Sequence, residues 1–265
     1  MRKVLLISCD GANCISDWLA SRLYLPQTLC FNKAKSIVIL SRANVILALL
    51  VLILTSLALG VSAIAKYPAF FAQPGAWTII LRLAFVLIAY ASTLVWIMST
   101  RDWNASREVI LRNATLYGVF GGSLEFINIG IENFFQQIQT PILPIVFMLT
   151  IFSLWGVSGF QTARSIRSTR AGLLAAVSSA VICMLIAVTV GFGIEIFAPP
   201  EPAYISTWAE FKRSGWTDAR AFGLANTFDS GLTHLIVAPM VAVVFGGLAC
   251  FLASLIGKKE RHLPR

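Results

Sequence analysis

Residues 43–65 read ANVILALLVLILTSLALGVSAIA, a run of sequence without a single charged side chain. A helix of about 20 apolar residues crosses the roughly 30 Å hydrocarbon core of a bilayer. The whole chain has the same character, because 57% of its 265 residues are hydrophobic and only 12% are charged. Soluble domains carry about 25% charged residues. The composition therefore excludes a soluble globular fold, a disordered chain and a disulfide-stapled module, and it predicts a membrane protein.

Five further stretches are long and apolar enough to span a bilayer. With the first they predict an all-α, polytopic bundle of six transmembrane helices, at 43–65, 76–98, 114–135, 142–160, 172–197 and 232–256. The third stretch is the most polar, because it holds Glu125, Asn128 and Glu132. The connections at 66–75 and 136–141 are short, which predicts that neighbouring spans pack antiparallel.

The basic residues fall mainly on one side of these six spans. Sixteen of the 21 Lys and Arg residues lie in residues 1–42, in the connections after the second and fourth spans, and in the tail 257–265. Only four lie on the opposite side, and Arg82 lies within a span. Because basic loops stay in the cytoplasm, both termini are predicted to be cytoplasmic. The protein is expected in the cytoplasmic membrane. The net charge of +9 is thus an orientation signal, and no nucleic-acid partner is expected.

Two segments outside the spans have features of their own. Residues 1–42 are predicted to be a cytoplasmic lead-in with a short amphipathic helix at the membrane interface. The apolar stripe of that helix consists of Ile15, Trp18, Leu19 and Leu23. The connection 198–231, between the fifth and sixth spans, mixes aromatic with charged residues. It is predicted to be one long outer loop that caps the bundle or rests on lipid headgroups.

This layout is similar to that of the membrane halves of ABC-type exporters of the second class. Those proteins also have an interfacial lead-in helix, six spans and a re-entrant loop before the sixth span, and the similarity is one of layout. It implies an ATP-binding subunit as a partner. A homo-oligomer is the alternative assembly within the lipid bilayer, and no cofactor is expected.

Ionisable residues inside the spans are the main indication of function, because each costs about 2.5–3.5 kcal/mol at mid-depth in a bilayer. Glu125, Asn128 and Glu132 follow an i, i+3, i+7 spacing and therefore share one helical face. At about 1.5 Å per residue, Glu125 lies close to the midplane. This face either lines a polar cavity that binds a cation or a proton-coupled solute, or it packs against other helices.

A second group of polar residues shares the outer third of the bilayer. Arg82, Glu132 and Glu195 are predicted to form an intramembrane ion pair, because a buried arginine needs an acidic partner. Asp229 and His234 lie at a similar depth, at the outer face. No metal site is expected from this group, because it contains one histidine and no spacing typical of metal ligands.

Two backbone features bear on helix packing. Gly118 and Gly122 form a small-xxx-small motif in the third span, which permits close approach of another helix. Pro239 lies in the outer part of the sixth span and can kink it, because proline lacks a backbone donor.

The sequence favours a transport-type protein, either a permease subunit or a small carrier, with Glu125 and Asn128 lining the path. The alternative is a non-transporting sensor, assembly factor or regulatory protein, whose intramembrane polar residues hold helices together. An enzyme is not favoured, because no Walker A, HExxH, GxSxG or dinucleotide-binding motif occurs in the chain.

Overall fold

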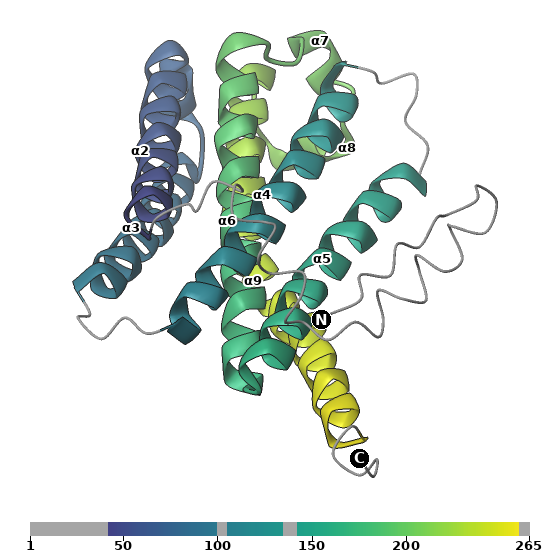
Figure 1. Ribbon diagram of the computed structural model, residues 1–265. Helices are drawn as coiled ribbons and strands as arrows, with labels where there is room; N and C mark the ends of the chain where they lie inside the picture. The colour runs from purple at the N-terminus through teal and green to yellow at the C-terminus, as the bar shows by residue number, and fades with distance from the viewer. Residues whose placement is uncertain (1–41, 100–104, 135–141, 260–265) are drawn as a thin grey trace, which may run out of the picture. The chain divides into compact units, whose positions relative to one another are not determined.

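The computed structural model describes residues 42–99, 105–134 and 142–259, and every element in these ranges is a helix (Figure 1). The predicted lead-in helix lies outside the described residues. Five of the described helices are long and apolar enough to cross a membrane, judged by length and composition. The chain is therefore compatible with a multi-pass membrane protein.

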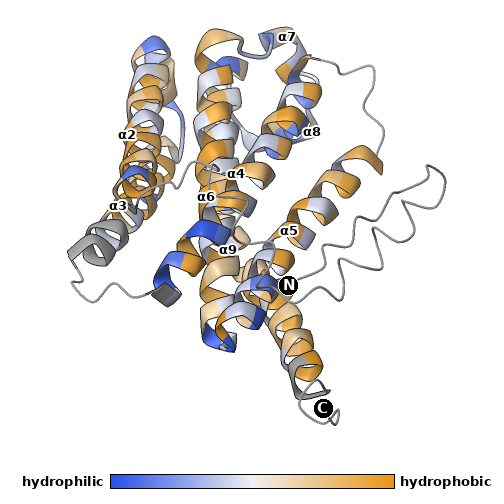
Figure 2. Cartoon of the chain, in the orientation of Figure 1, coloured by the Kyte–Doolittle hydropathy of each residue, from blue (hydrophilic) through white to orange (hydrophobic). Residues whose placement is uncertain are grey.

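Four helices begin within three residues of predicted spans: α2 (Arg42–Lys66), α3 (Ala76–Ser99), α5 (Ile142–Ile166) and α6 (Thr169–Phe197). The central helix is α6, which contacts α2, α4, α5 and α9. Its apolar window is 56% buried, against 17–33% for the other four apolar helices. Figure 2 shows that hydrophobic residues cover most of the length of these helices.

Residues 114–134 of the third predicted span lie within α4 (Ala105–Phe134), a continuous helix of 30 residues. Its first turns hold Arg107, Glu108 and Arg112, and they are hydrophilic in Figure 2. These charges and the three polar residues of the predicted span keep α4 out of the set of five apolar helices. It nevertheless packs extensively against α6 and also against α5, so α4 is an integral part of the bundle.

The last helix differs from its prediction, because α9 (Ala219–Lys259) begins well before residue 232. Asp218 caps its start, since Oδ1 accepts a hydrogen bond from the backbone nitrogen of Ala221 at 2.9 Å. The sequence predicts a loop at residues 219–231 because polar residues lower their hydropathy, and these residues instead form the first turns of α9. The remaining connection contains two short helices, α7 (Pro202–Ile205) and α8 (Ala209–Ser214), and η1 (Pro68–Ala72) joins α2 to α3.

Glycines bring α4 into direct contact with α6. A Cβ atom on Gly118 would lie 2.7 Å from Cβ of Ile182 and 2.8 Å from the backbone oxygen of Ser179. A Cβ atom on Gly122 would lie 2.9 Å from Cβ of Ile186. Atoms of real side chains do not approach so closely, so the two helices pack at a distance that only glycine allows. This is the close approach that the small-xxx-small spacing permits.

Small residues also bring α5 and α9 close to α6. A Cβ atom on Gly172 of α6 would lie 2.6 Å from the backbone oxygen of Gly159 in α5. One turn further along the same face of α6, a Cβ atom on Gly246 of α9 would lie 2.5 Å from Cβ of Ala176. Three helices therefore contact α6 at backbone distance: α5 and α9 near its start, away from α7, and α4 near its middle.

The proline in α9 has a specific partner on α3. Pro239 lacks an N–H group, so it cannot pair with the carbonyl oxygen of Leu235, four residues earlier. The hydroxyl group of Tyr90 donates a hydrogen bond to this same oxygen. An unpaired carbonyl group costs several kcal/mol in hydrocarbon. The side chain from α3 thus satisfies the group that the proline leaves open.

Replacing Gly118 with alanine should destabilise the protein by about 1–3 kcal/mol, the usual cost of overpacking. The added methyl group would meet the backbone of α6, which cannot move aside as a flexible side chain can. The thermal midpoint of the purified protein should fall accordingly. Gly130→Ala in the same helix is the matched control, because nothing lies within 4 Å of a Cβ atom there. Equal effects of the two substitutions would contradict the packing described here.

Removing the Tyr90 hydroxyl group as Tyr90→Phe should lower stability by about 1–3 kcal/mol, because the Leu235 carbonyl loses the hydrogen bond from this side chain. The effect should depend on the proline. In a Pro239→Ala background, the new N–H group pairs with the Leu235 oxygen, so Tyr90→Phe should cost much less. A double-mutant cycle on thermal midpoints measures this coupling, and additive effects would refute it.

Candidate functional site

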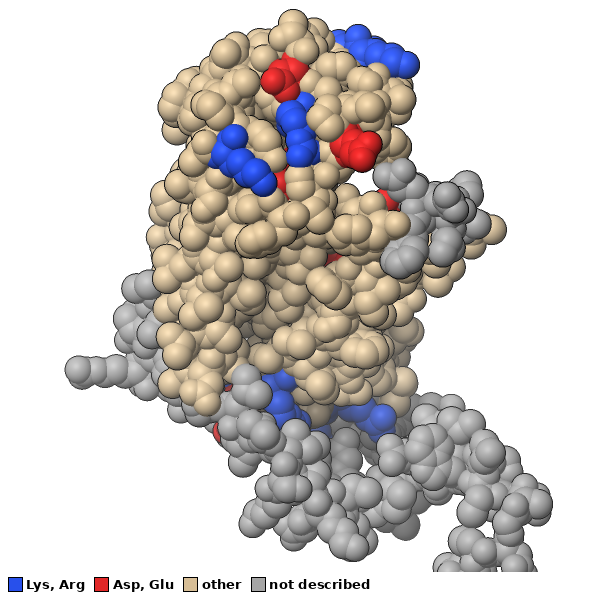
Figure 3. All heavy atoms as spheres, turned by 90° about the horizontal axis from the view of Figure 1, so that it is seen from above, with Lys and Arg blue, Asp and Glu red and all other residues tan. Residues whose placement is uncertain are grey.

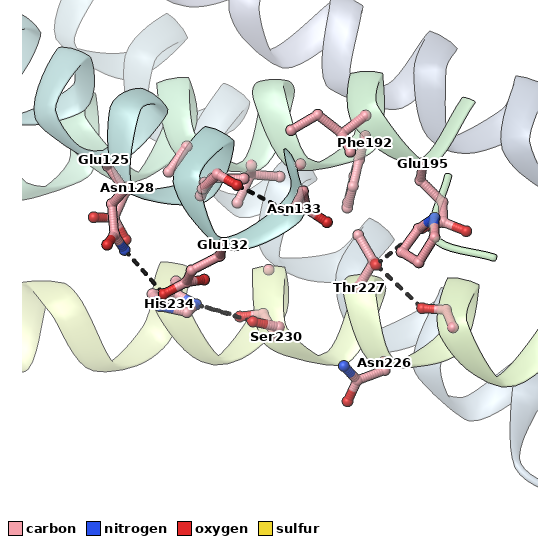
Figure 4. Close-up of a pocket in the computed structure, with 18 of the residues that line it drawn as sticks. Glu125, Asn128, Glu132, Asn133, Phe192, Glu195, Asn226, Thr227, Ser230 and His234 are labelled. Atoms are coloured by element: carbon pink, nitrogen blue, oxygen red, sulfur yellow. Dashed lines mark hydrogen bonds between the residues drawn. The ribbon is translucent and has the colours of Figure 1, made fainter. Parts of the chain in front are cut away.

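A cavity of about 720 Å³ lies among α4, α6 and α9, at the end of the bundle where α7 and α8 are found (Figure 4). Each wall is one helical face, with lining residues at spacings of three and four. On α4 these are Glu125, Asn128, Ile129, Glu132 and Asn133, and on α9 they are Gly223, Asn226, Thr227, Ser230, Gly231 and His234. We call this cavity the vestibule.

A second cavity, of about 300 Å³, extends from the vestibule between α5, α6 and α9. We call it the chamber. The two cavities share four lining residues: Glu125, Asn128, Pro144 and His234. These four residues form a neck between a polar space and an apolar one.

The α4 wall carries the polar face predicted from the sequence. Asn128 Nδ2 donates a hydrogen bond to Glu132 Oε1 at 3.3 Å, which orients both side chains along the wall. Glu125 lines both cavities and forms no hydrogen bond with another residue in the described part of the chain. The deepest carboxylate of this wall is therefore available to a ligand.

On the opposite wall, His234 is held by its own helix. Its Nδ1 atom lies 2.7 Å from the carbonyl oxygen of Ser230, and because a carbonyl oxygen can only accept, Nδ1 donates this bond. The second ring nitrogen, Nε2, remains available as an acceptor, or as a donor when the ring is protonated. Figure 4 shows the ring close to the carboxylate of Glu132.

The α6 wall carries Glu195, a carboxylate that is 2% exposed. Its Oε1 atom is buried without a hydrogen-bond partner. Its Oε2 atom lies 3.3 Å from the Thr227 hydroxyl oxygen, which also lies 3.1 Å from the carbonyl oxygen of Gly223. One hydroxyl proton serves both acceptors, so Glu195 lacks the partners that a buried carboxylate requires.

The basic residues nearest to Glu195 are held elsewhere. Lys66 Nζ donates to the carbonyl oxygen of Ile196 at 2.8 Å. Arg220 donates to the carbonyl oxygen of Pro200 and, at 3.1 Å, to the hydroxyl group of Tyr67. Neither cation forms an ion pair with Glu195, although both lie near enough to attract it.

The charge of the vestibule is one-sided. Glu125, Glu132 and Glu195 line it, and no Lys or Arg is among the described residues that do so. A cleft lined by one sign of charge in a low-dielectric surrounding concentrates ions of the opposite sign. The vestibule is therefore suited to cations.

Aromatic residues hold the rim of the vestibule against the bundle. Tyr204 and Trp208 line the cavity and pack edge to face, with ring centroids 5.6 Å apart. Trp208 continues to Phe222 at 6.5 Å. From there edge-to-face pairs run into the core through Trp216, Phe70, Phe228 and Phe192. The connection between α6 and α9 is thus anchored by edge-to-face aromatic contacts.

The structure gathers most of the residues that the sequence marked. Glu125, Asn128 and Glu132 line the vestibule together with Glu195 and His234. Asp229 is exposed on α9 and does not line either cavity.

Arg82 lies apart from these residues. Its side chain is exposed on α3, a helix that packs against α9, α2 and η1 and does not line either cavity. Within the described residues, no ion pair joins Arg82 to Glu132 or Glu195. The expectation of such a pair rested on depth along the spans, and equal depth does not determine which helices are neighbours.

Some lining residues were not predicted from the sequence. Asn226 and Ser230 precede the predicted His234 at steps of four residues and share its face of α9. This spacing was present in the sequence, but a window of hydropathy places its first half in a loop. Asn133 was missed because it follows the last residue of the marked α4 face.

Among the described residues, no three His, Cys, Asp or Glu side chains come together closely enough to hold a metal ion. Comparisons of the chain with protein-family models, with curated proteins and with solved structures found no match. The described helices and cavity therefore define the class of protein. It is an all-helical protein with five apolar helices of membrane-spanning length and a polar cavity between its helices.

Proposed function

We propose that this chain is a membrane transport protein, either a permease subunit or a small carrier, whose vestibule binds a cation or a proton-coupled solute. One observation carries the proposal: Glu125, Asn128 and Glu132 line a cavity that also contains the buried, unpaired Glu195. Carboxylates within a membrane bundle are costly and are typical of ion and proton pathways. A cavity of this size admits a solute as well as water.

The proposal includes six transmembrane helices: the five apolar helices and α4. At about 1.5 Å per residue, its 30 residues extend about 45 Å, more than the thickness of the hydrocarbon core. It also packs against α6 and α5, as a span of the same bundle would. Six crossings would return the chain to its starting side, so in this proposal both termini share one side of the membrane.

The charges support this orientation in the cytoplasmic membrane. In Figure 3 most of the visible charged side chains lie at two opposite ends of the face shown, with a broad uncharged band between them. The end opposite α7 holds Arg107, Arg112, Arg164, Arg167 and Arg170. By the positive-inside rule this end is cytoplasmic. The vestibule then opens toward the outside, and the glycine contacts with α6 close the bundle toward the cytoplasm.

The alternative function is a non-transporting sensor, assembly factor or regulatory protein, in which polar residues join helices. Such bonds do occur in this bundle. Asn113 Nδ2 donates to Thr162 Oγ1 at 2.9 Å, and the hydroxyl groups of Ser56 and Thr189 lie 2.7 Å apart. Glu125 joins no helix in this way, which favours transport. The transport proposal includes a partner at the membrane. This partner is an ATP-binding subunit or a second copy of the chain.

The topology can be tested with two single cysteines in a cysteine-free background. Ser165→Cys lies at the end of α5 and Ser206→Cys follows α7, and both positions are exposed. In intact cells a membrane-impermeant maleimide should label Cys at position 206 and should not label position 165 until the cells are opened. Labelling of both or the reverse pattern would contradict the proposed orientation.

Glu125→Gln should abolish transport while the free energy of unfolding changes by no more than about 0.5 kcal/mol. Glutamine keeps the shape of the side chain but can carry neither the charge nor the proton. The assay follows uptake of Na⁺, K⁺ and tetramethylammonium into vesicles that contain the purified protein and a pH-sensitive dye. Asp229→Asn, an exposed residue outside the cavities, should transport as the unmodified protein does. A normal rate for Glu125→Gln removes Glu125 from the mechanism.

A further inference from the structure

We propose that the ligand of this site is an amphipathic organic cation, with its charged group in the vestibule and its apolar part in the chamber. The inference rests on the proposed function and adds the substrate class to it. Three features of the cavities carry it: their connection, the apolar lining of the chamber and the unpaired carboxylate of the vestibule.

The connection between the cavities sets the position of the charge. Glu125, Asn128 and His234 line both spaces, so a ligand that occupies both must pass between them. Glu125 is the only carboxylate among the described residues that line the chamber. A cationic group therefore lies on the vestibule side of the neck or at the neck itself, within reach of Glu125 and Glu132.

The chamber itself is apolar and aromatic. Its lining includes Met148, Ile151, Phe152, Trp155, Met184 and Val237. Phe152 and Trp155 pack with ring centroids 5.1 Å apart, and Trp155 is fully buried. Aromatic faces and polarisable methionine sulfur atoms bind flat apolar groups well. A space of about 300 Å³ holds a group of the size of a benzene ring with room to spare.

The acidic side chains of the vestibule would stabilise a positively charged group of a ligand. Glu195 is 98% removed from solvent and its Oε1 atom has no hydrogen-bond partner. Thr227 lies at Glu195 and His234 lies two helical turns further along α9, so the two acidic regions are about 10 Å apart. Tyr204 and Trp208 supply aromatic faces at the rim, and such faces attract organic cations.

Other ligand classes fit this arrangement less well. An anion would meet three carboxylates, and no Lys or Arg is among the described lining residues. A divalent metal ion requires several ligand atoms that converge at about 2–2.6 Å, and no such group occurs in the described part of the chain. A neutral apolar solute would leave Glu195 without compensation. An organic cation matches both the acidic and the apolar space.

The test compares two cations that differ by one ring. Equilibrium dissociation constants of tetramethylammonium and benzyltrimethylammonium are measured on the purified full-length protein in lipid nanodiscs. The ring should enter the chamber and tighten binding by at least about tenfold, as the burial of an aromatic group does. Neopentylbenzene, the neutral isostere, should not displace benzyltrimethylammonium.

Two matched substitutions on α9 locate the ring. Val241→Phe fills the chamber that Val241 lines, so it should weaken benzyltrimethylammonium at least about tenfold and leave tetramethylammonium much less affected. Val244→Phe adds the same volume at an exposed position that lines neither cavity. It should bind both cations as the unmodified protein does.

The outcomes separate this inference from the proposed function. If tetramethylammonium binds as tightly as benzyltrimethylammonium, or if Val241→Phe and Val244→Phe behave alike, the substrate class is wrong and the transport proposal stands. If neither cation binds and Glu125→Gln transports normally, the proposed function is wrong, and the inference falls with it. Displacement by neopentylbenzene would show that the site does not select charge and would overturn the inference alone.

Discussion

The architecture depends on the backbone contacts that α6 makes with three neighbouring helices. In a membrane, helices gain little from apolar burial against one another, because lipid is as apolar as their side chains. Close packing must therefore supply the attraction, and it requires small residues. Gly118 on α4 and Gly246 on α9 reach α6 at distances that exclude a Cβ atom, and Gly172 of α6 itself reaches α5 at such a distance. The central position of α6 follows from these contacts.

The same four helices divide into a tight half and an open half. On α4 the glycine contacts end at Gly122 and the cavity lining begins at Glu125. On α9 the lining ends at Val241 and the close contact follows at Gly246. Helices pinned together in one half and separated in the other enclose a space that is closed at one end. Closing the open half while the tight half separates would expose the cavity on the opposite side, as transport by alternating access requires.

The sequence predicted the helices well because each apolar run is long, and hydropathy is an average over such a run. It predicted the α4 polar face because a spacing of three and seven residues defines a face within one helix. It could not place Arg82, because neighbours across the bundle depend on side-chain shapes in several helices at once. The predicted start of α9 was wrong for another reason. Residues such as Thr227 and Ser230 line the vestibule, so their low hydropathy did not mean that the helix ended.

The distribution of satisfied and unsatisfied polar groups distinguishes the site from the scaffold. In the scaffold, the Leu235 carbonyl that Pro239 leaves open is paired by Tyr90 on another helix, and Asn113 is paired by Thr162. Such pairing is expected, because hydrocarbon offers no water in exchange. Glu195 lies in the same bundle with an unpaired oxygen atom. Three uncharged groups, of Thr115, Trp155 and Ser179, are also buried without a partner. A carboxylate costs far more to bury unpaired than they do, so Glu195 is the described residue whose chemistry most requires a partner from outside the chain, and a cation fits that requirement.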